Sequence, residues 1–365
     1  MIRKNPTLFI LAVSLLIFTL SSKNAWSEGE SASDLTIEQK QEKRLLFNQY
    51  VEDEIARREK EKYKNKQEEQ KKTWISKVSS VYGYDSNVNL NSSHRGDGFF
   101  QETMEGSFKI DRPSIPAIAS AGRLGVNWYN EFYEYENTET LSYQTSSISV
   151  FTEEKINPKL KLKLAYEFSN LRYYHNDQLN YYGHKAKPTF TYYFSDHLSV
   201  NFYTSYEYRD YISRKALDNA NGPSGEGRVD GYYELGIGPR FYPTDKTYIG
   251  GTLALKWNDS NDAFHQYNDY DGWKANGFIY QKLNDRFSTV ALAGYDYKNY
   301  ASRTFQADSA ETEEDRLFYL GDNLYYDFNK NWQVFCSYVY KQNDCNDPLL
   351  EFSGYTMSAG VNFTF

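Results

Sequence analysis

Most of the chain alternates apolar and polar side chains with a period of two residues. The segment at 159–168 reads KLKLKLAYEF, and the segments LSVNFYTSYEY at 198–208 and RLGVNWYNEF at 123–132 repeat its pattern. Successive side chains of a β-strand point to opposite faces, so this period predicts strands with one apolar and one polar face. Strands of this kind are typical of antiparallel sheets.

Short turns and longer polar loops alternate between these segments. We expect short connections at 112–117, 156–159, 194–197, 243–246, 283–286 and 328–331. We expect long polar loops near 91–98, 133–141, 172–180, 213–230, 258–268, 300–313 and 342–349. These six short and seven long connections join about fourteen strands. Because that number is even, both ends of the sheet should lie on the side of the short turns.

The polar face of these strands carries too many charges for a dry protein core. Its charged residues include Lys161, Lys163, Glu167, Lys185, Lys187, Glu207, Arg209, Arg240 and Lys256. Burying so many charges away from water is very costly, which argues against a soluble β-sandwich. A water-filled lumen can hold them, and we expect these nine side chains to line one. The predicted fold class is therefore all-β: a transmembrane antiparallel up-and-down β-barrel of about 14 strands over residues 73–365.

Aromatic residues make up 18% of the chain, and 35 residues are tyrosine. Several occur in pairs where strands are expected to end: Tyr173–Tyr174, Tyr181–Tyr182, Tyr192–Tyr193 and Tyr325–Tyr326. Aromatic rings are enriched at the boundary between lipid headgroups and hydrocarbon. We therefore expect these pairs to belong to the two aromatic girdles of a membrane barrel.

The N-terminal part of the chain differs from the predicted barrel. Residues 1–27 have the features of a secretory signal peptide, because Arg3 and Lys4 precede an apolar run at 8–20 that is too short to span a bilayer. Residues 28–72 are rich in charge and carry only a narrow apolar stripe. We expect them to form a charged helical periplasmic segment, either a spacer or a helix that docks a periplasmic partner.

The period of two continues to the last residue of the chain, which ends in SAGVNFTF. Ser358, Gly360, Phe363 and Phe365 fill a pattern that resembles the C-terminal assembly signal of bacterial outer-membrane β-barrel proteins such as porins. The resemblance implies a location in the Gram-negative outer membrane with both chain ends in the periplasm. It also implies four kinds of partner: membrane lipid, lipopolysaccharide, the barrel-assembly machinery and periplasmic chaperones.

A narrower resemblance rests on the sequence YDSNVN at 84–89, in the first expected strand. It is similar to the start of the barrel domain in surface lipoprotein assembly modifier-type proteins, and the length of 73–365 also suits such a barrel. In that family the barrel follows a periplasmic helical-repeat domain. Here the charged segment 28–72 stands in its place, so the role of that domain in handling a substrate does not carry over.

The sequence shows no arrangement of side chains that predicts covalent chemistry. His197 and Ser199 have a spacing that could serve a nucleophilic serine, but they adjoin a short turn. Asp262, His265 and Asp269 share one loop without a second cluster to complete a site. We therefore expect a protein that is not an enzyme and has no cofactor.

Metal binding and disulfide formation are also not expected. The acidic segments 258–272 and 307–316 could hold divalent cations, but solvated loops that face lipopolysaccharide are the simpler interpretation. Only Cys336 and Cys345 could form a disulfide, and the loop between them would have to fold back to join them. Two independent thiols are the favoured interpretation.

The net charge of −8 argues against a nucleic-acid-binding surface. The main functional expectation is an outer-membrane channel or transporter with a polar, charge-lined lumen that passes small hydrophilic solutes. One alternative is an export or assembly barrel that moves a polymer, a polypeptide or a lipoprotein to the cell surface, with a periplasmic partner docked on 28–72. Another is a structural or adhesive surface barrel.

Overall fold

The computed structural model describes residues 74–88, 90, 95–112, 122–220, 222–264, 267–304, 311–348 and 350–365. The predicted signal peptide at 1–27 and the charged segment at 28–72 lie outside the described residues. The strands in the described part are β1 (Trp74–Asp85), β2 (Asp97–Arg112), β3 (Gly122–Tyr135), β4 (Tyr143–Asn157), β5 (Leu160–Tyr173), β6 (Tyr181–Tyr193), β7 (Leu198–Leu217), β8 (Pro223–Thr244), β9 (Thr247–Ser260), β10 (Tyr270–Lys282), β11 (Phe287–Thr304), β12 (Thr312–Asp327), β13 (Trp332–Cys345) and β14 (Phe352–Thr364).

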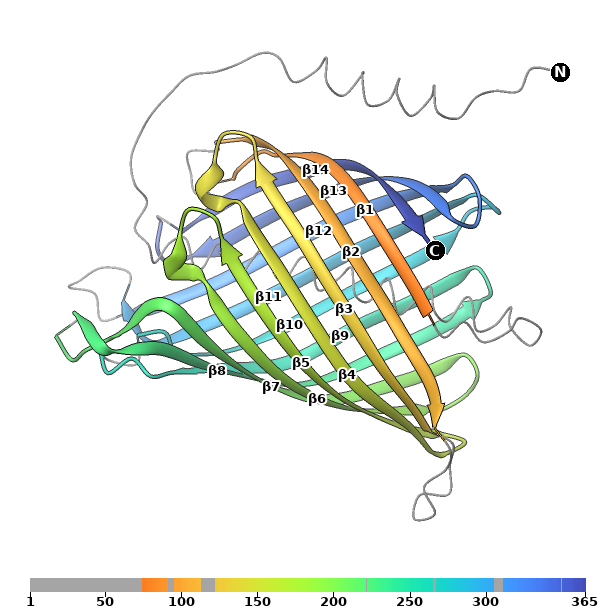
Figure 1. Ribbon diagram of the computed structural model, residues 1–365, viewed down its shortest axis with the longest axis horizontal. Coiled ribbons are helices and arrows are strands. Elements are labelled where there is room, and N and C mark those ends of the chain that lie inside the picture. The colour runs from red at the N-terminus through yellow and green to blue at the C-terminus, as the bar shows by residue number, and fades with distance from the viewer. Residues whose placement is uncertain are drawn as a thin grey trace.

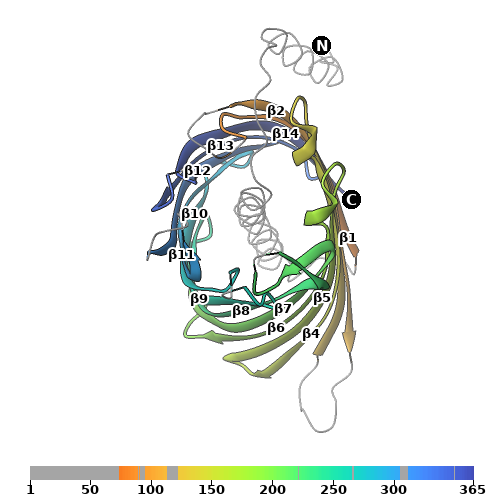
Figure 2. The same cartoon turned by 90° about the vertical axis from the view of Figure 1, so that its left-hand side faces the viewer.

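These strands form one closed antiparallel barrel (Figure 1). Each strand pairs with its neighbours in chain order, and β1 pairs with β14 to close the sheet, with Lys77 opposite Thr364. Viewed after a 90° turn, the strands make a continuous wall (Figure 2). The predicted all-β, up-and-down barrel of about 14 strands is confirmed.

Two short 3-10 helices interrupt the long loops, η1 (Glu139–Leu141) and η2 (Asp177–Leu179). Across the described ranges, no helix has both the length and the apolar composition needed to cross a membrane.

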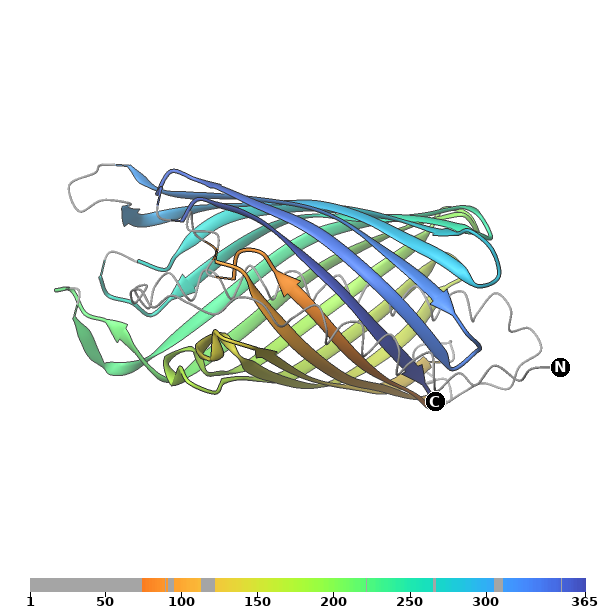
Figure 3. The same cartoon turned by 90° about the horizontal axis from the view of Figure 1, so that it is seen from above.

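The connections differ in length at the two ends of the barrel. At one end, strands are joined by connections such as 158–159, 245–246 and 328–331, and the chain ends there too (Figure 3). At the other end, β7 and β8 run further than their neighbours and project as a hairpin (Figure 3). The predicted loop at 213–230 is therefore wrong in extent, because strand pairing continues to Leu217 opposite Pro223.

The outer face of the barrel is apolar and exposed. In β9, the exposed positions between the two ends of the strand include Ile249, Leu253, Leu255 and Trp257, while the residues between them are buried or half-buried. Exposed aliphatic and aromatic side chains recur on every other strand position around the barrel, as in Leu164, Phe202, Leu320 and Met357. A continuous apolar outer surface is the arrangement of a transmembrane β-barrel.

Ion pairs between strands that are not neighbours identify the inner face. Lys256 on β9 pairs with Asp296 on β11, across β10. Lys274 on β10 pairs with Glu234 on β8 at 2.8 Å, across β9. Neighbouring strands are about 4.8 Å apart, so side chains two strands apart meet only where the curved sheet makes them converge. These charged residues therefore point toward the inside of the barrel.

The aromatic pairs at the strand ends do not lie together at the outer surface. Tyr174 and Tyr182 are exposed, but Tyr173, Tyr181 and Tyr325 are buried. Adjacent residues of a strand point to opposite faces, so only one ring of such a pair can belong to an outer girdle. The buried rings pack on the inner face instead, where one cluster consists of Tyr143, Leu171, Tyr173, Leu179, Tyr181 and Tyr211. The girdle prediction is wrong for the inward member of these pairs.

The last strand is paired along both edges. Ser358 lies opposite Gly83 on β1 and Ser337 on β13, and Gly360 lies opposite Val81 and Phe335. The Phe365 amide donates to the carbonyl of Ser76 at 2.9 Å. The Phe363 ring contacts both Trp332 and Phe365, with ring centroids 4.5 Å and 4.7 Å apart. The assembly role predicted for these residues stays a prediction.

Changing Phe365 to Glu should slow assembly of the barrel in cells and leave refolding in detergent nearly unchanged. Full burial of a Phe side chain stabilises a fold by about 1.5–3 kcal/mol, and Phe365 is 56% exposed, so its structural contribution is smaller. Its larger effect would come through the barrel-assembly machinery, which would recognise the terminal strand by pairing with it as an additional strand of a sheet. The measurement is the rate at which pulse-labelled protein becomes heat-modifiable in outer-membrane fractions.

A matched control is Phe194→Glu, because Phe194 lies in the β6–β7 turn at the same end and is 55% exposed. This variant should assemble at the normal rate. Equal rates for Phe365→Glu and the wild type would contradict the targeting interpretation of the C-terminus.

Candidate functional site: the charged inner face and its rim

Four of the predicted lumen residues lie together on β5, β6 and β7. Glu207 pairs with Arg209 at 2.6 Å and with Lys185 at 3.5 Å. Glu167, on β5, lies opposite Lys185 in the strand register. Side chains from three consecutive strands thus lie together on the inner face. The cluster holds two positive and two negative charges.

Two further predicted residues pair with acids that the sequence analysis did not select. Lys161 pairs with Glu153 on β4 at 3.0 Å, and Lys256 pairs with Asp296 on β11. The basic residues on this face are therefore balanced by nearby carboxylates. A lumen that attracts only anions does not follow from them.

The remaining predicted residues contact aromatic rings. The Lys163 amine lies 4.4 Å from the centre of the Phe151 ring, and the Lys187 amine lies 4.6 Å from that of Tyr203. Arg240 donates to the carbonyl of Gly251 and lies 5.8 Å from the centre of the Phe278 ring. A cation over an aromatic face is favourable, so these rings help to hold the basic side chains in place. That all nine residues line a water-filled lumen stays a prediction.

Other inner-face ion pairs were not predicted as pairs, although their residues follow the same alternation. They form the pairs Lys77–Glu105, Lys274–Glu234, Lys341–Asp85 and Arg228–Asp230. Their position in the period of two would have placed them on the polar face. Their partners could not have been inferred, because the pairing depends on strand register and on the curvature of the sheet.

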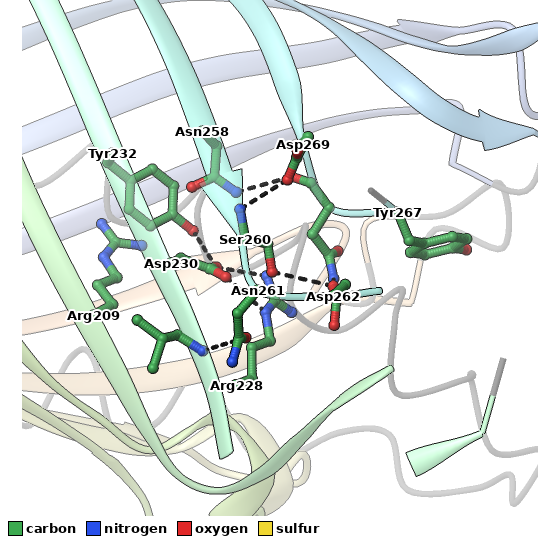
Figure 4. Close-up of polar contacts among 12 residues, drawn as sticks. Arg209, Arg228, Asp230, Tyr232, Asn258, Ser260, Asn261, Asp262, Tyr267 and Asp269 are labelled. Atoms are coloured by element: carbon green, nitrogen blue, oxygen red, sulfur yellow. Dashed lines mark hydrogen bonds and ion pairs between the residues drawn. The ribbon is translucent and has the colours of Figure 1, made fainter. Parts of the chain in front are cut away.

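The rim of the barrel beside the β7–β8 hairpin carries a second polar network (Figure 4). Arg228 makes two hydrogen bonds to the Asp230 carboxylate, at 2.9 Å and 2.6 Å. Tyr232 donates to the same carboxylate at 3.1 Å, and its ring lies 4.0 Å from the Arg209 guanidinium. Asp230 is fully buried. This pair therefore links the rim to the charged cluster around Glu207.

The β9–β10 loop holds the β7–β8 hairpin at two levels, beside its turn at Leu217 and nearer its base at Val229. Asp262 accepts a hydrogen bond from the Leu217 amide at 2.7 Å, and the Ala263 amide donates to the Leu217 carbonyl at 2.8 Å. Asn261 exchanges hydrogen bonds with the backbone of Val229 at 2.9 Å and 3.0 Å. The two ends of the projecting hairpin are thus held by one short loop that follows β9 (Figure 4).

Asp269, at the end of this loop, has a raised pKa. Burial and the nearby carboxylates of Asp259, Asp230 and Asp262 raise its pKa to about 6, although the Ser260 amide, which donates to it at 2.8 Å, acts in the opposite direction. The folded protein therefore holds the proton more tightly than the unfolded chain. The stabilisation from the protonated carboxyl is complete below pH 3.8 and is lost as the pH rises to about 6.

The β9–β10 loop should consequently open more readily at pH 7.5 than at pH 5. Hydrogen exchange of its backbone amides, corrected for the intrinsic pH dependence, should be faster at the higher pH in the wild type. Asp269→Asn should remove most of that difference, because the amide oxygen can still accept from Ser260 but carries no charge. Asp271→Asn, at an exposed acid two residues further along, is the control and should behave like the wild type. A persistent pH effect in Asp269→Asn would contradict the assignment.

The residues considered for catalysis that the structure describes take part in turn and loop contacts. His197 Nδ1 donates to the carbonyl of Tyr242 at 2.9 Å in the turn region, and Ser199 is buried on β7. Asp262 and Asp269 belong to the loop network described above, and His265 lies outside the described residues. Asp262 therefore serves to hold the hairpin.

Comparisons with known proteins give only distant likenesses. No family model matches the chain, and no curated protein matches it. Among solved structures, the chain is similar to OmpT of Vibrio cholerae at 11% identity, with a TM-score of 0.44 over 80% of this chain and 97% of that one. The outer membrane channel DcaP of Acinetobacter baumannii is 11% identical, with a TM-score of 0.46 over 80% of this chain and 96% of that one. The translocator domain of the autotransporter NalP from Neisseria meningitidis is 10% identical, with a TM-score of 0.30 over 86% of this chain and 96% of that one.

Proposed function

We propose that this protein is an outer-membrane channel that passes small hydrophilic solutes through a lumen lined by paired charges. The observation that carries the proposal is the contrast between the two faces of one closed sheet. The outer face is apolar and exposed, as lipid requires, while the inner face carries ion pairs that cross between strands. A sealed apolar interior would not be built from so many charges.

The inner charges are also partly accessible. The side chains of Lys161, Lys185 and Glu234 are 34%, 24% and 21% exposed although they belong to ion pairs inside the barrel. Charged groups that keep contact with solvent avoid most of the desolvation cost of burial. A polar path along the inner wall accounts for this exposure, and its balanced charges suit hydrophilic solutes of either sign.

The test is single-channel recording of the purified full-length protein in planar bilayers. We expect stepwise conductance with weak ion selectivity. Lys161→Glu and Lys185→Glu should each shift the reversal potential in a salt gradient toward cation permeation, because they replace a positive lumen charge by a negative one. Lys330→Glu, in the turn at 328–331 outside the lumen, should leave the selectivity nearly unchanged. A silent bilayer with correctly folded protein would overturn the proposal and favour the export or structural alternatives.

A further inference from the structure

A buried group of metal-ligating side chains lies on the inner face of β12 and β13. It consists of Glu313, Asp315 and Cys345, whose ligand atoms all lie within 4.8 Å of one another. Asp315 and Cys345 are directly opposite in the strand register, and Glu313 is two residues away on the same face. The three side chains are at most 7% exposed. Burial distinguishes this group from the acidic surface loops of the barrel.

A fourth side chain gives independent support for a bound cation. Asn343 is fully buried, and its amide nitrogen donates to the Asp315 carboxylate at 3.0 Å and to the Leu350 carbonyl at 2.9 Å. These bonds hold the amide beside the cluster, yet its oxygen Oδ1 has no hydrogen-bond partner among the described residues. A buried acceptor without a partner costs about 1–3 kcal/mol, so an ion that it could ligate would be favourable.

We propose that Cys345, Asp315, Glu313 and Asn343 bind one divalent cation of the zinc class. The donor set combines a thiolate sulfur with carboxylate and amide oxygens. Mg²⁺ and Ca²⁺ prefer oxygen ligands alone, whereas Zn²⁺ accepts sulfur and carboxylate oxygen in a tetrahedral site. Ligands of one Zn²⁺ lie roughly 3–4 Å from one another, so the observed spacing of the Glu313, Asp315 and Cys345 ligand atoms requires only small side-chain movements, whereas Asn343 would turn its amide to bring Oδ1 to the ion.

Two basic side chains border the site and should lower its affinity for a metal ion. Arg303 lies 3.5 Å from Glu313, and Lys298 lies opposite Asp315 in the register. Both compete with a metal for the carboxylates. Arg303 also donates to Asn268 Oδ1 at 2.6 Å and to the Tyr267 carbonyl, so it would keep hydrogen bonds if Glu313 turned to the ion. We expect weaker binding than at a site of four thiolates.

The sequence suggested only part of this site. The segment 307–316 stood out as acidic, but Cys345 is about thirty positions further along the chain. Only the register of β12 against β13 brings Asp315 opposite Cys345. The other cysteine, Cys336, is exposed, and the two cysteines do not form a disulfide with each other.

The two cysteines provide a matched test with Co²⁺ as the probe. Full-length barrel refolded in detergent should develop the thiolate-to-cobalt charge-transfer absorption when titrated with Co²⁺, and Zn²⁺ should displace it. Cys336→Ala should keep the band, and Cys345→Ala should lose it. Heat-modifiable mobility on a gel shows that each variant has folded.

Glu313→Gln keeps the test decisive if Cys345→Ala does not fold. It should weaken Co²⁺ binding by roughly tenfold or more and leave the barrel folded. The proposal would be overturned by a folded wild type without the band, by a band that persists in Cys345→Ala, or by an unchanged affinity in Glu313→Gln.

Discussion

A lysine in place of Leu253 should prevent most molecules of this barrel from inserting into a bilayer. Leu253 is 53% exposed on the outer face of β9, midway along the apolar run from Ile249 to Trp257. Its neighbours in the register are Ile237 and Ala275, so no acid lies beside it. A lysine facing lipid near the bilayer midplane costs about 2–4 kcal/mol. The measurement is the yield of heat-modifiable barrel after refolding into lipid vesicles, together with its urea midpoint.

Thr252→Lys is the matched control, because it introduces the same side chain one residue earlier and on the inner face. Asn276 lies opposite Thr252, and its Oδ1 has no hydrogen-bond partner among the described residues, so it offers an acceptor for the new amine. This variant should fold with nearly the wild-type yield. If the two variants fold equally well or equally badly, the assignment of faces is wrong.

Removing the carboxylate of Asp230 should destabilise the barrel strongly at its rim. Arg228 and Asp230 form a buried pair with two hydrogen bonds, and the guanidinium lies 4.8 Å from the centre of the Tyr211 ring. Loss of one partner leaves a buried charge without its counter-ion, which costs about 3–5 kcal/mol. Asp230→Ala should therefore lower the urea midpoint and increase hydrogen exchange in the β7–β8 hairpin.

The double variant Arg228→Leu/Asp230→Leu separates the loss of a charge partner from the loss of the pair. Apolar replacement of a whole buried pair is often nearly neutral, so the double variant should recover much of the lost stability. Asp111→Ala removes one partner of the more exposed Arg123–Asp111 pair and should change stability by less than about 1 kcal/mol. If Asp230→Ala costs no more than Asp111→Ala, the pair is not the buried anchor that the geometry indicates.

The fold was accessible from the sequence because one local property repeats along the chain. In a strand, the side-chain period fixes which residues share a face, and KLKLKLAYEF shows that period without any knowledge of neighbours. The same rule, applied strictly, would have corrected the girdle prediction for Tyr173 and Tyr181. It also placed Lys185 on the same polar face as Glu207, with which it pairs in the structure.

Contacts between distant segments depended on tertiary structure. The sequence by itself determined that strands alternate, how many there are, and that Lys256 and Asp296 both lie on polar faces. Only the closed barrel decided that these two residues meet across β10, that Asp262 fastens the β7–β8 hairpin, and that Cys345 lies opposite Asp315. The physical reason is that a side chain's face follows from its own strand, whereas its partner follows from register and curvature. Those are properties of the whole sheet, because a shift of one residue in the pairing of two strands would move every side chain of the shifted strand to the other face.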